Sequence, residues 1–498
     1  MALSLASILA ESAARHPSRT AVVCGSERIS YSALWEEARR GAAYLQELGV
    51  RPGDRVAVLL PNVPDFPRTY YGILAAGAVV VPVHSLLTPD EIAYLLRDSG
   101  ACMLICHEAL RAGGEAGALA AGVPCRISGP VPQQPVGAIA RREAEDDAVV
   151  LYTSGTTGFP KGAVLSQSNL VFNASVTALE LFAISSADVL LAALPLFHSF
   201  GQTCVMNAAF RAGASIVLMP RFDGPAALEL MVREGVTVFM GVPTMYIALL
   251  DAANNDGRRP RLRAAASGGS SLPVAVLEAW EAVFGAQILE GYGLSETSPV
   301  ASFNQHEFGR KPGTVGCGIW GVELDIARPE VDDRIELLAR GELGEIVIRG
   351  HCVFKGYLNK PEATAAAKID GWFRSGDLGT KDADGFITII DRKKDMILRG
   401  GFNVYPREIE EVLMRHPAVK NVAVIGLPHA THGEEIHAVV VAQNDSIVDP
   451  AAIIVWSQEH LAKYKYPRFV HVVESLPLGP SGKVLKRELR ATFASGRS

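Results

Sequence analysis

Hydroxyl residues, glycines and one lysine crowd residues 152–162, directly after a short apolar run. Backbone N–H groups in such a loop can converge on an anion, and Lys161 adds the positive charge that a triphosphate requires. The pattern is not a Walker loop, because Pro160 precedes the lysine and Gly162 replaces the magnesium-binding hydroxyl. An ordinary glycine-rich turn is the alternative, but it does not account for so many hydroxyls beside a lysine. The stretch therefore predicts an ATP site built from Thr153, Ser154, Gly155, Thr156, Thr157, Gly158 and Lys161.

A second cluster, residues 290–297, joins an aromatic ring, two glycines and a carboxylate after another apolar run. Tyr292 can stack on an adenine ring, and the glycines allow close approach to the backbone. Glu296 offers the hard oxygen ligand for Mg²⁺ that the first loop lacks. A solvated turn is the alternative interpretation of this cluster taken alone.

Two further clusters place single charged residues on glycine turns. Asp377 closes the segment 371–377, where a carboxylate can accept hydrogen bonds from both hydroxyls of a ribose. Lys483 follows proline, serine and glycine near the C-terminal end of the sequence. Taken alone, the aspartate is weak evidence for a site, and the lysine would be an ordinary exposed side chain.

Short apolar runs that end in glycine or hydroxyl loops must position these clusters. Helical stretches lie between the runs, and this alternation predicts an α/β fold with parallel sheets, in which ligands bind beyond the carboxyl ends of the strands. Residues 107–146 are rich in Ala, Gly and Pro without clear periodicity, which predicts a surface excursion. The apolar runs are 55–60, 148–152, 215–219, 236–240 and 287–290.

The pattern changes toward the C-terminal end. Residues 344–349 and 386–390 alternate like antiparallel strands, and a charged run at 391–395 then interrupts the apolar pattern. Beyond it, Pro406 opens an amphipathic helix, followed by β-rich runs. We therefore expect a large N-terminal domain, residues 1–390, and a small α+β C-terminal domain, residues 391–498.

Composition excludes several classes of protein. A chain of 498 residues with 49% hydrophobic residues needs more than one core, and a net charge of -6 argues against a nucleic-acid partner. The longest apolar run, 72–81, falls short of the ~20 residues that span a bilayer. Residues 1–11 lack the basic leader of a signal peptide, and the seven cysteines contain no CxxC pair. A reducing cytoplasm is the expected location.

Three histidines near the end of the chain are possible metal ligands by residue type. His429, His432 and His437 lack cysteine partners and an HExxH pattern, which favours a polar loop over a zinc site.

Together, the four clusters in this order resemble the adenylate-forming (ANL) superfamily of acyl- and aryl-CoA synthetases, luciferases and peptide-synthetase adenylation domains. The resemblance spans almost the whole chain, and it is greatest to the acyl- and aryl-CoA synthetase branch, with amide bond synthetases as close relatives. Its motifs are Tyr31, 75–82, the phosphate loop, 195–198, the Tyr292 loop, Gly376 and Asp377, Asp391 and Arg392, Gly400 and Gly401, and Lys483.

This resemblance implies a fold and a reaction. The large domain would hold stacked sheets with helices and a β-barrel-like part, and the small domain would be mobile about a hinge at Asp391. A carboxylate would attack the α-phosphate of ATP, giving an acyl-adenylate and pyrophosphate, with Lys483 as the catalytic residue and Mg²⁺ at Glu296. The remaining expected site residues are His198 beside the acid, Gly268, Thr297 and Arg392 at the nucleotide, and Gly400 and Gly401 at a tunnel for CoA.

The acid and its acceptor follow from the same resemblance. The segments expected to wall the acid contain no Lys or Arg, so a second carboxylate would be buried unpaired, and a neutral fatty or aryl acid is favoured. Gly201 stands where amino-acid-activating relatives carry an aspartate, which argues against an α-amino acid. CoA is the favoured acceptor and an amine, giving an amide, is the alternative; a non-catalytic nucleotide-binding protein is the rival of another class. The wall segments are 198–206, 240–246, 264–272 and 291–303.

Overall fold

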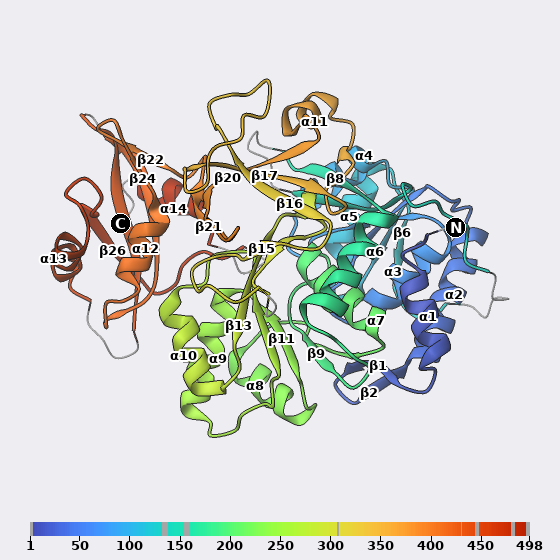
Figure 1. Ribbon diagram of the computed structural model, residues 1–498. Helices are drawn as coiled ribbons and strands as arrows, with labels where there is room; N and C mark the ends of the chain where they lie inside the picture. The colour runs from blue at the N-terminus through green and yellow to red at the C-terminus, as the bar shows by residue number, and fades with distance from the viewer. Residues whose placement is uncertain are drawn as a thin grey trace.

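The computed structural model describes residues 3–131, 138–153, 159–305, 308–429, 431–443, 448–479 and 484–494. These residues form four β-sheets with helices packed on them, which confirms the expected α/β class. The C-terminal residues, in orange and red in Figure 1, form a separate lobe beside the rest of the chain.

The largest sheet is parallel through its centre and antiparallel at both edges. All five of the expected apolar runs overlap strands of the two large sheets, three of them in this sheet and two in the second. In spatial order the strands are β15 (Cys317–Gly318), β14 (Val300–Phe303), β13 (Ile288–Gly293), β12 (Ala264–Ser267), β11 (Val238–Gly241), β9 (Val189–Ala192), β10 (Ser215–Leu218), β1 (Thr20–Cys24) and β2 (Glu27–Ser30).

The second sheet is parallel except where β7 pairs with β8 and β8 with β18. Because β7 and β8 are antiparallel neighbours, the phosphate loop between them connects a hairpin instead of a strand and a helix. The strands in spatial order are β18 (Gly356–Tyr357), β8 (Lys161–Ser166), β7 (Asp147–Thr153), β4 (Val79–Pro82), β3 (Arg55–Leu59), β5 (Met103–Cys106) and β6 (Cys125–Ile127).

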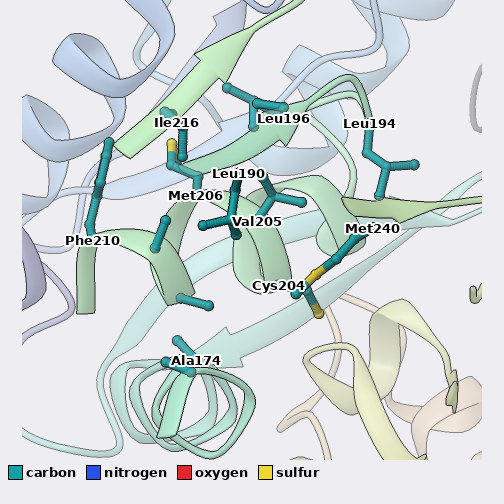
Figure 2. Close-up of a cluster of buried hydrophobic side chains, with 14 of the residues drawn as sticks. Ala174, Leu190, Leu194, Leu196, Cys204, Val205, Met206, Phe210, Ile216 and Met240 are labelled. Atoms are coloured by element: carbon teal, nitrogen blue, oxygen red, sulfur yellow. The ribbon is translucent and has the colours of Figure 1, made fainter. Parts of the chain in front are cut away.

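Both faces of these sheets are buried, as continuous apolar strands require. In β3, for example, Val56 and Val58 pack in one hydrophobic cluster, while Ala57 and Leu59 pack in another on the opposite face. Figure 2 shows part of the larger cluster, where side chains from the largest sheet meet helical residues.

The helices that accompany these two sheets are α1 (Ser7–Arg15), α2 (Tyr31–Glu47), α3 (Asp65–Ala75), α4 (Pro89–Ser99), α6 (Gln167–Val176), α7 (Ala208–Ala212), α8 (Gly224–Arg233), α9 (Pro243–Asn255), α10 (Val274–Phe284) and the π-helices η2 (Thr177–Leu181) and η3 (Phe200–Asn207).

The expected surface excursion at 107–146 is wrong for much of its length. It contains the short helix η1 (Glu108–Leu110), α5 (Arg111–Ala121) and β6, which pairs in parallel with β5. The reason lies in the small residues of α5: a Cβ at Gly114 would approach Cys106 Sγ to 2.5 Å, and one at Gly117 would approach Ile92 to 2.7 Å. These glycines let the helix pack against its neighbours, so they indicate close contact and not a loop.

Two smaller sheets follow in the chain. The third sheet is antiparallel and corresponds to the expected barrel-like part. It contains β16 (Val322–Ala327), β17 (Gly344–Gly350), β20 (Trp372–Lys381), β19 (Lys368–Ile369) and β21 (Ile387–Arg392), with α11 (Pro361–Ala367) beside it. The last sheet contains β23 (Phe402–Val404), β22 (Ile397–Arg399), β25 (Gly433–Ala442), β24 (Val419–His429) and β26 (Phe469–Val473), with α12 (Pro406–Leu413), α13 (Pro450–His460) and α14 (Lys486–Ala494).

Sheet membership changes after Arg392, which ends β21 in the third sheet, and β22 begins the last sheet at Ile397. The change of sheet lies close to residue 391, and the domain boundary at that residue remains a prediction. None of the helices in the described part of the chain is long and apolar enough to cross a membrane. All seven cysteines are free thiols, as expected from their spacing.

Candidate active site

The hairpin of β7 and β8 brings the two described ends of the phosphate loop together. Thr153 and Lys161 are direct partners in this antiparallel pair, and both line a large cavity. The Lys161 ammonium lies 5.2 Å from the centre of the Tyr357 ring, so its charge sits at the cavity wall. The predicted phosphate-binding residues Ser154, Gly155, Thr156, Thr157 and Gly158 lie outside the described residues.

Glu296 is a buried carboxylate at the wall of the same cavity. It lies in the 3₁₀ turn η4 (Ser295–Thr297), and its Oε1 accepts hydrogen bonds from Tyr357 Oη at 2.9 Å and Thr153 Oγ1 at 3.3 Å. Burial, and then the Glu296 charge, raise the pKa of Tyr357 far above its ordinary value, so the phenol stays a donor. Among the described residues, no lysine or arginine is in ion-pair contact with Glu296. A buried carboxylate that faces a cavity and feels a cation only at longer range, here Arg392, suits a hard divalent cation.

Asp377 connects the Tyr292 loop to the third sheet. Tyr292 Oη donates to Asp377 Oδ2 at 2.6 Å, and Arg392 Nε lies 3.3 Å from Asp377 Oδ1. Asp377 and Arg392 are direct partners in the pairing of β20 with β21, so the sheet register fixes this ion pair. Burial, followed by the charge of Asp377, raises the pKa of Tyr292 well above its ordinary value. All three side chains line the cavity.

A buried ion pair supports the turn that presents Asp377. Arg374 Nη2 lies 2.5 Å from Glu345 Oε2, and the two side chains are only 7% and 5% exposed. The other carboxylate oxygen of Glu345 accepts the backbone N–H of Gly376 at 3.0 Å. Glu345 therefore fixes both the arginine and the backbone immediately before Asp377.

The cavity encloses about 1070 Å³ and joins this polar region to an apolar end. Figure 2 shows Cys204 and Met240, which both line the cavity, at the same end of the cluster of buried hydrophobic side chains. Phe182 and Phe303 are in edge-to-face contact there, with ring centres 5.1 Å apart. The apolar end is lined by Leu181, Phe182, Phe200, Cys204, Met240, Val300 and Phe303, and these residues carry no charge.

Residues from the C-terminal part of the chain close another side of the cavity. Lys393 and Lys394 line it, as do Gly479 and Val484, which flank residues 480–483 on either side. The predicted catalytic residue Lys483 itself lies outside the described residues.

Comparison with known proteins identifies the family. Residues 9–358 match the family model described as AMP-binding enzyme, and residues 408–483 match that of the AMP-binding enzyme C-terminal domain. The chain belongs to the AMP-binding enzyme family. This confirms the resemblance to the adenylate-forming superfamily that the four clusters predicted.

Relatives of this AMP-binding enzyme match it over nearly their full lengths. A long-chain-fatty-acid–CoA ligase of Bacillus subtilis (strain 168) is 36% identical, covering 98% of this chain and 94% of the relative. A feruloyl-CoA synthase of an Amycolatopsis species is 39% identical and covers 96% of both chains. A crystal structure of ATP-bound MatB from Rhodopseudomonas palustris has a TM-score of 0.91 at 35% identity and covers 100% of both chains. These relatives support the acyl-CoA ligase branch that the sequence predicted.

The other predicted site residues of this AMP-binding enzyme take different places. Gly268 and His198 line the cavity, and His198 Nδ1 accepts the backbone N–H of Phe200 at 3.3 Å. Thr297 is fully buried, and its hydroxyl bonds the backbone of its own loop. Gly400 and Gly401 form the turn between β22 and β23, apart from the described residues that line the cavity.

Sequence reasoning missed two contacts of the site. Tyr357, the partner of Glu296, follows a glycine on the two-residue strand β18, a pattern too common to single it out. Tyr152 donates to Asp98 Oδ2 at 2.7 Å, so the first residue of the stretch 152–162 is hydrogen-bonded to α4. A hydrogen-bonding partner far away in the sequence leaves no local signal, and neither pairing could be found from spacing.

Proposed function

We propose that this enzyme activates a carboxylic acid with ATP and transfers the acyl group to CoA, forming an acyl-CoA, AMP and pyrophosphate. The proposal rests on one continuous cavity. Charged side chains suited to holding a nucleotide, Lys161, Glu296 and Asp377, line one end, and uncharged apolar side chains line the other. An acid placed with its carboxylate toward Lys161 and its tail toward Phe303 would bring its reacting oxygen to the nucleotide end. The relatives named above support the same reaction class.

The first step joins two anions. A carboxylate oxygen attacks the α-phosphorus of ATP, a new P–O bond forms, and the P–O bond to pyrophosphate breaks. Repulsion between the carboxylate and the phosphates opposes the approach, so positive charge placed where negative charge develops lowers the barrier. Lys161, the first residue of β8, supplies one such charge. Glu296, with Thr153 beside it, is the group that would hold Mg²⁺, which neutralises phosphate charge when bound.

Lys483 supplies the second positive charge in this proposal. Gly479 and Val484 line the cavity on either side of the segment that contains this lysine, and Leu478 bridges to Val484 in antiparallel fashion. We propose that Lys483, which lies between these two residues in the sequence, acts on the reacting phosphate. Asp377, ion-paired with Arg392, would accept hydrogen bonds from the ribose hydroxyls, as its position in the cavity allows.

The acid is one with an uncharged tail. Burying a second carboxylate against Phe182, Met240 and Phe303 without a cationic partner would cost several kcal/mol, so diacids are disfavoured. Aromatic walls and the small residues Gly268 and Gly291 accommodate either a planar ring or a flexible chain. A fatty acid or an aryl acid is therefore the proposed substrate class.

CoA is the proposed acceptor, and its approach involves the C-terminal residues. Gly400 and Gly401 have positive φ angles of 57° and 84°, which glycine adopts without strain. Both lie away from the cavity in this structure, so we propose that the C-terminal lobe reorients between the two steps and brings this turn to the acyl-adenylate.

The test is product identification by mass spectrometry. Purified protein is mixed with ATP, Mg²⁺, CoA and single acids: palmitate, octanoate, ferulate, benzoate and, as the disfavoured diacid, malonate. We expect acyl-CoA and AMP from at least one neutral-tailed acid and little from malonate. Formation of an amide from an added amine, with no thioester, would overturn the choice of acceptor. Pyrophosphate release with no acid, or with malonate alone, would overturn the proposed substrate class.

A further inference from the structure

Two histidines and a glutamate meet at the hairpin between β24 and β25 in the last sheet. His429 ends β24, His432 lies in the turn, and Glu435 lies in β25. The two Nδ1 atoms are 3.2 Å apart, and Glu435 Oε2 lies 3.8 Å from His432 Nδ1. One possible ligand atom from each of the three side chains lies within 4.8 Å of the other two.

The third member of this group differs from the one considered in the sequence. His437, grouped with His429 and His432 by proximity in the chain, instead places its Nδ1 3.0 Å from His471 Nε2 on β26. Glu435 takes its place beside the two histidines. The grouping is a property of the hairpin register, which pairs His429 with Gly433 and Leu427 with Glu435 across the two strands.

We propose that His429, His432 and Glu435 form a binding site for a transition-metal dication such as Zn²⁺. With Zn–N distances of about 2.0–2.1 Å, two nitrogens 3.2 Å apart subtend an N–Zn–N angle of about 100–105°, close to the tetrahedral value. Glu435 Oε2, 3.8 Å from His432 Nδ1, can bind the same ion as that nitrogen at ligand distances of about 2.0–2.2 Å. Two imidazoles and a carboxylate leave a fourth position for water.

Hydrogen bonding shows that one nitrogen of the group is an acceptor in this structure. The backbone N–H of Thr431 donates to His429 Nδ1 at 3.4 Å, so that nitrogen carries no proton. The Thr431 hydroxyl lies 3.3 Å from the Nδ1 atoms of both His429 and His432. A metal ion would displace the long Thr431 hydrogen bond from His429 Nδ1, and the exposure of the imidazoles to solvent gives the ion a path of entry.

Arg399 limits the affinity and the choice of ion. Its Nη2 donates to Glu435 Oε2 at 3.0 Å, so the carboxylate charge is shared with a guanidinium. The two imidazoles must then provide most of the binding. Ions that prefer nitrogen ligands, such as Zn²⁺, Ni²⁺ and Cu²⁺, are expected to bind, whereas Mg²⁺ and Ca²⁺ are not.

The site is connected to the glycine turn. The backbone N–H of Gly400 donates to the His432 carbonyl at 2.8 Å, and Arg399 pairs with Gly433 across the strands. A metal on His432 would restrain this turn. We therefore expect bound metal to slow acyl transfer to CoA without slowing pyrophosphate release. This kinetic consequence rests on the proposed function, whereas the proposal that the site binds metal does not depend on it.

The binding test uses the full-length protein after treatment with a chelator. Zn²⁺ is titrated in competition with a chromogenic chelator for the wild type, His429→Gln, His432→Gln and His460→Gln, the last replacing an exposed histidine on α13. We expect the wild type and His460→Gln each to bind one Zn²⁺ with the same affinity. In His429→Gln and His432→Gln this affinity should fall more than about tenfold, since even loss of a supporting group around a metal costs that much. Unchanged stoichiometry and affinity in His432→Gln would overturn the proposal.

A spectroscopic and a kinetic measurement separate binding from its consequence. Co²⁺ added to the wild type should give the visible absorption of a four-coordinate ion, absent in His432→Gln. Zn²⁺ should slow acyl-CoA formation in the wild type more than in His432→Gln, with equal pyrophosphate release. Equal inhibition of both proteins would overturn the coupling to the glycine turn. Absence of acyl-CoA in metal-free wild type would contradict the proposed function and leave the binding result standing.

Discussion

The Tyr292 phenol donates a 2.6 Å hydrogen bond to the Asp377 carboxylate, and so joins the largest sheet to the third sheet at the nucleotide end of the cavity. Tyr292→Phe removes a hydrogen bond to a buried charge, which is expected to lower the free energy of unfolding by about 2 kcal/mol and to raise KM for ATP. Urea denaturation and initial rates check both effects. Tyr31→Phe, which removes a buried bond to the Ala214 carbonyl, is the control: it should lose stability without changing KM for ATP.

Glu296→Gln tests the proposed magnesium site. The amide retains an acceptor for Tyr357 and Thr153 but removes the charge that would hold the cation. We expect the pyrophosphate release rate to fall by about 100-fold or more, and the Mg²⁺ concentration required for half-maximal rate to rise. Tyr357→Phe, which keeps the carboxylate, should have a much smaller effect. An unaltered Mg²⁺ dependence in Glu296→Gln would place the metal elsewhere.

Glu345→Ala should destabilise the protein strongly. It leaves Arg374 buried without its partner and removes the acceptor for the Gly376 N–H, so the free energy of unfolding should fall by about 3–5 kcal/mol. Glu323→Ala is the matched control in the same sheet, because its pair with Arg349 is about half exposed and should contribute about 1 kcal/mol or less. Similar midpoints for the two variants in urea would contradict this account.

Glu290 should make stability depend on pH. Burial raises its pKa from 4.5 to about 7, an increase that the charge of Arg407 and two backbone donors reduce. Between these values the unfolded chain loses the proton first, so this group lowers stability as pH rises from about 4.5 to 7, by up to about 3 kcal/mol. The stability of Glu290→Gln relative to the wild type should therefore increase over that range and stay level above it. Urea denaturation at pH 5, 6, 7 and 8 measures this difference, and a constant difference would contradict it.

Gly291→Ala should narrow the acid pocket. A Cβ at this position would approach the Phe303 ring to 2.4 Å, so this ring, which lines the cavity, must shift. Overpacking of this kind costs about 1–3 kcal/mol, and kcat/KM for the largest accepted acid should fall about tenfold relative to a small acid. Gly113→Ala, where a Cβ meets open space, is the control. Equal losses for large and small acids would mean that Phe303 does not limit the tail.

The parallel sheets and the loops that end their strands could be predicted because each leaves a local signal. Buried strands are continuous apolar runs, and glycine or hydroxyl residues mark their ends, as at β7 and β13. Family motifs then linked loops that are far apart in the chain. Thr153, Lys161, Glu296 and Asp377 accordingly meet in one cavity.

What could not be predicted depends on partners in distant segments. The pairings of Glu296 with Tyr357 and of Arg374 with Glu345 follow from how strands are placed beside one another, which no spacing encodes. The helix α5 was missed for a related reason. Gly117 packs against Ile92 of another helix, where a larger side chain would clash, so this glycine reflects a contact and not a turn. Composition alone cannot distinguish a glycine that packs from one that turns.

The most direct test of the central claim separates the two half-reactions in Lys483→Ala. If this lysine neutralises charge as the acid attacks ATP, the variant should release pyrophosphate at least about 100-fold more slowly than the wild type. It should still convert a supplied acyl-adenylate and CoA to acyl-CoA at a rate close to that of the wild type. Unchanged pyrophosphate release in Lys483→Ala would contradict the account, because the residue assigned to adenylate formation would then have no part in it.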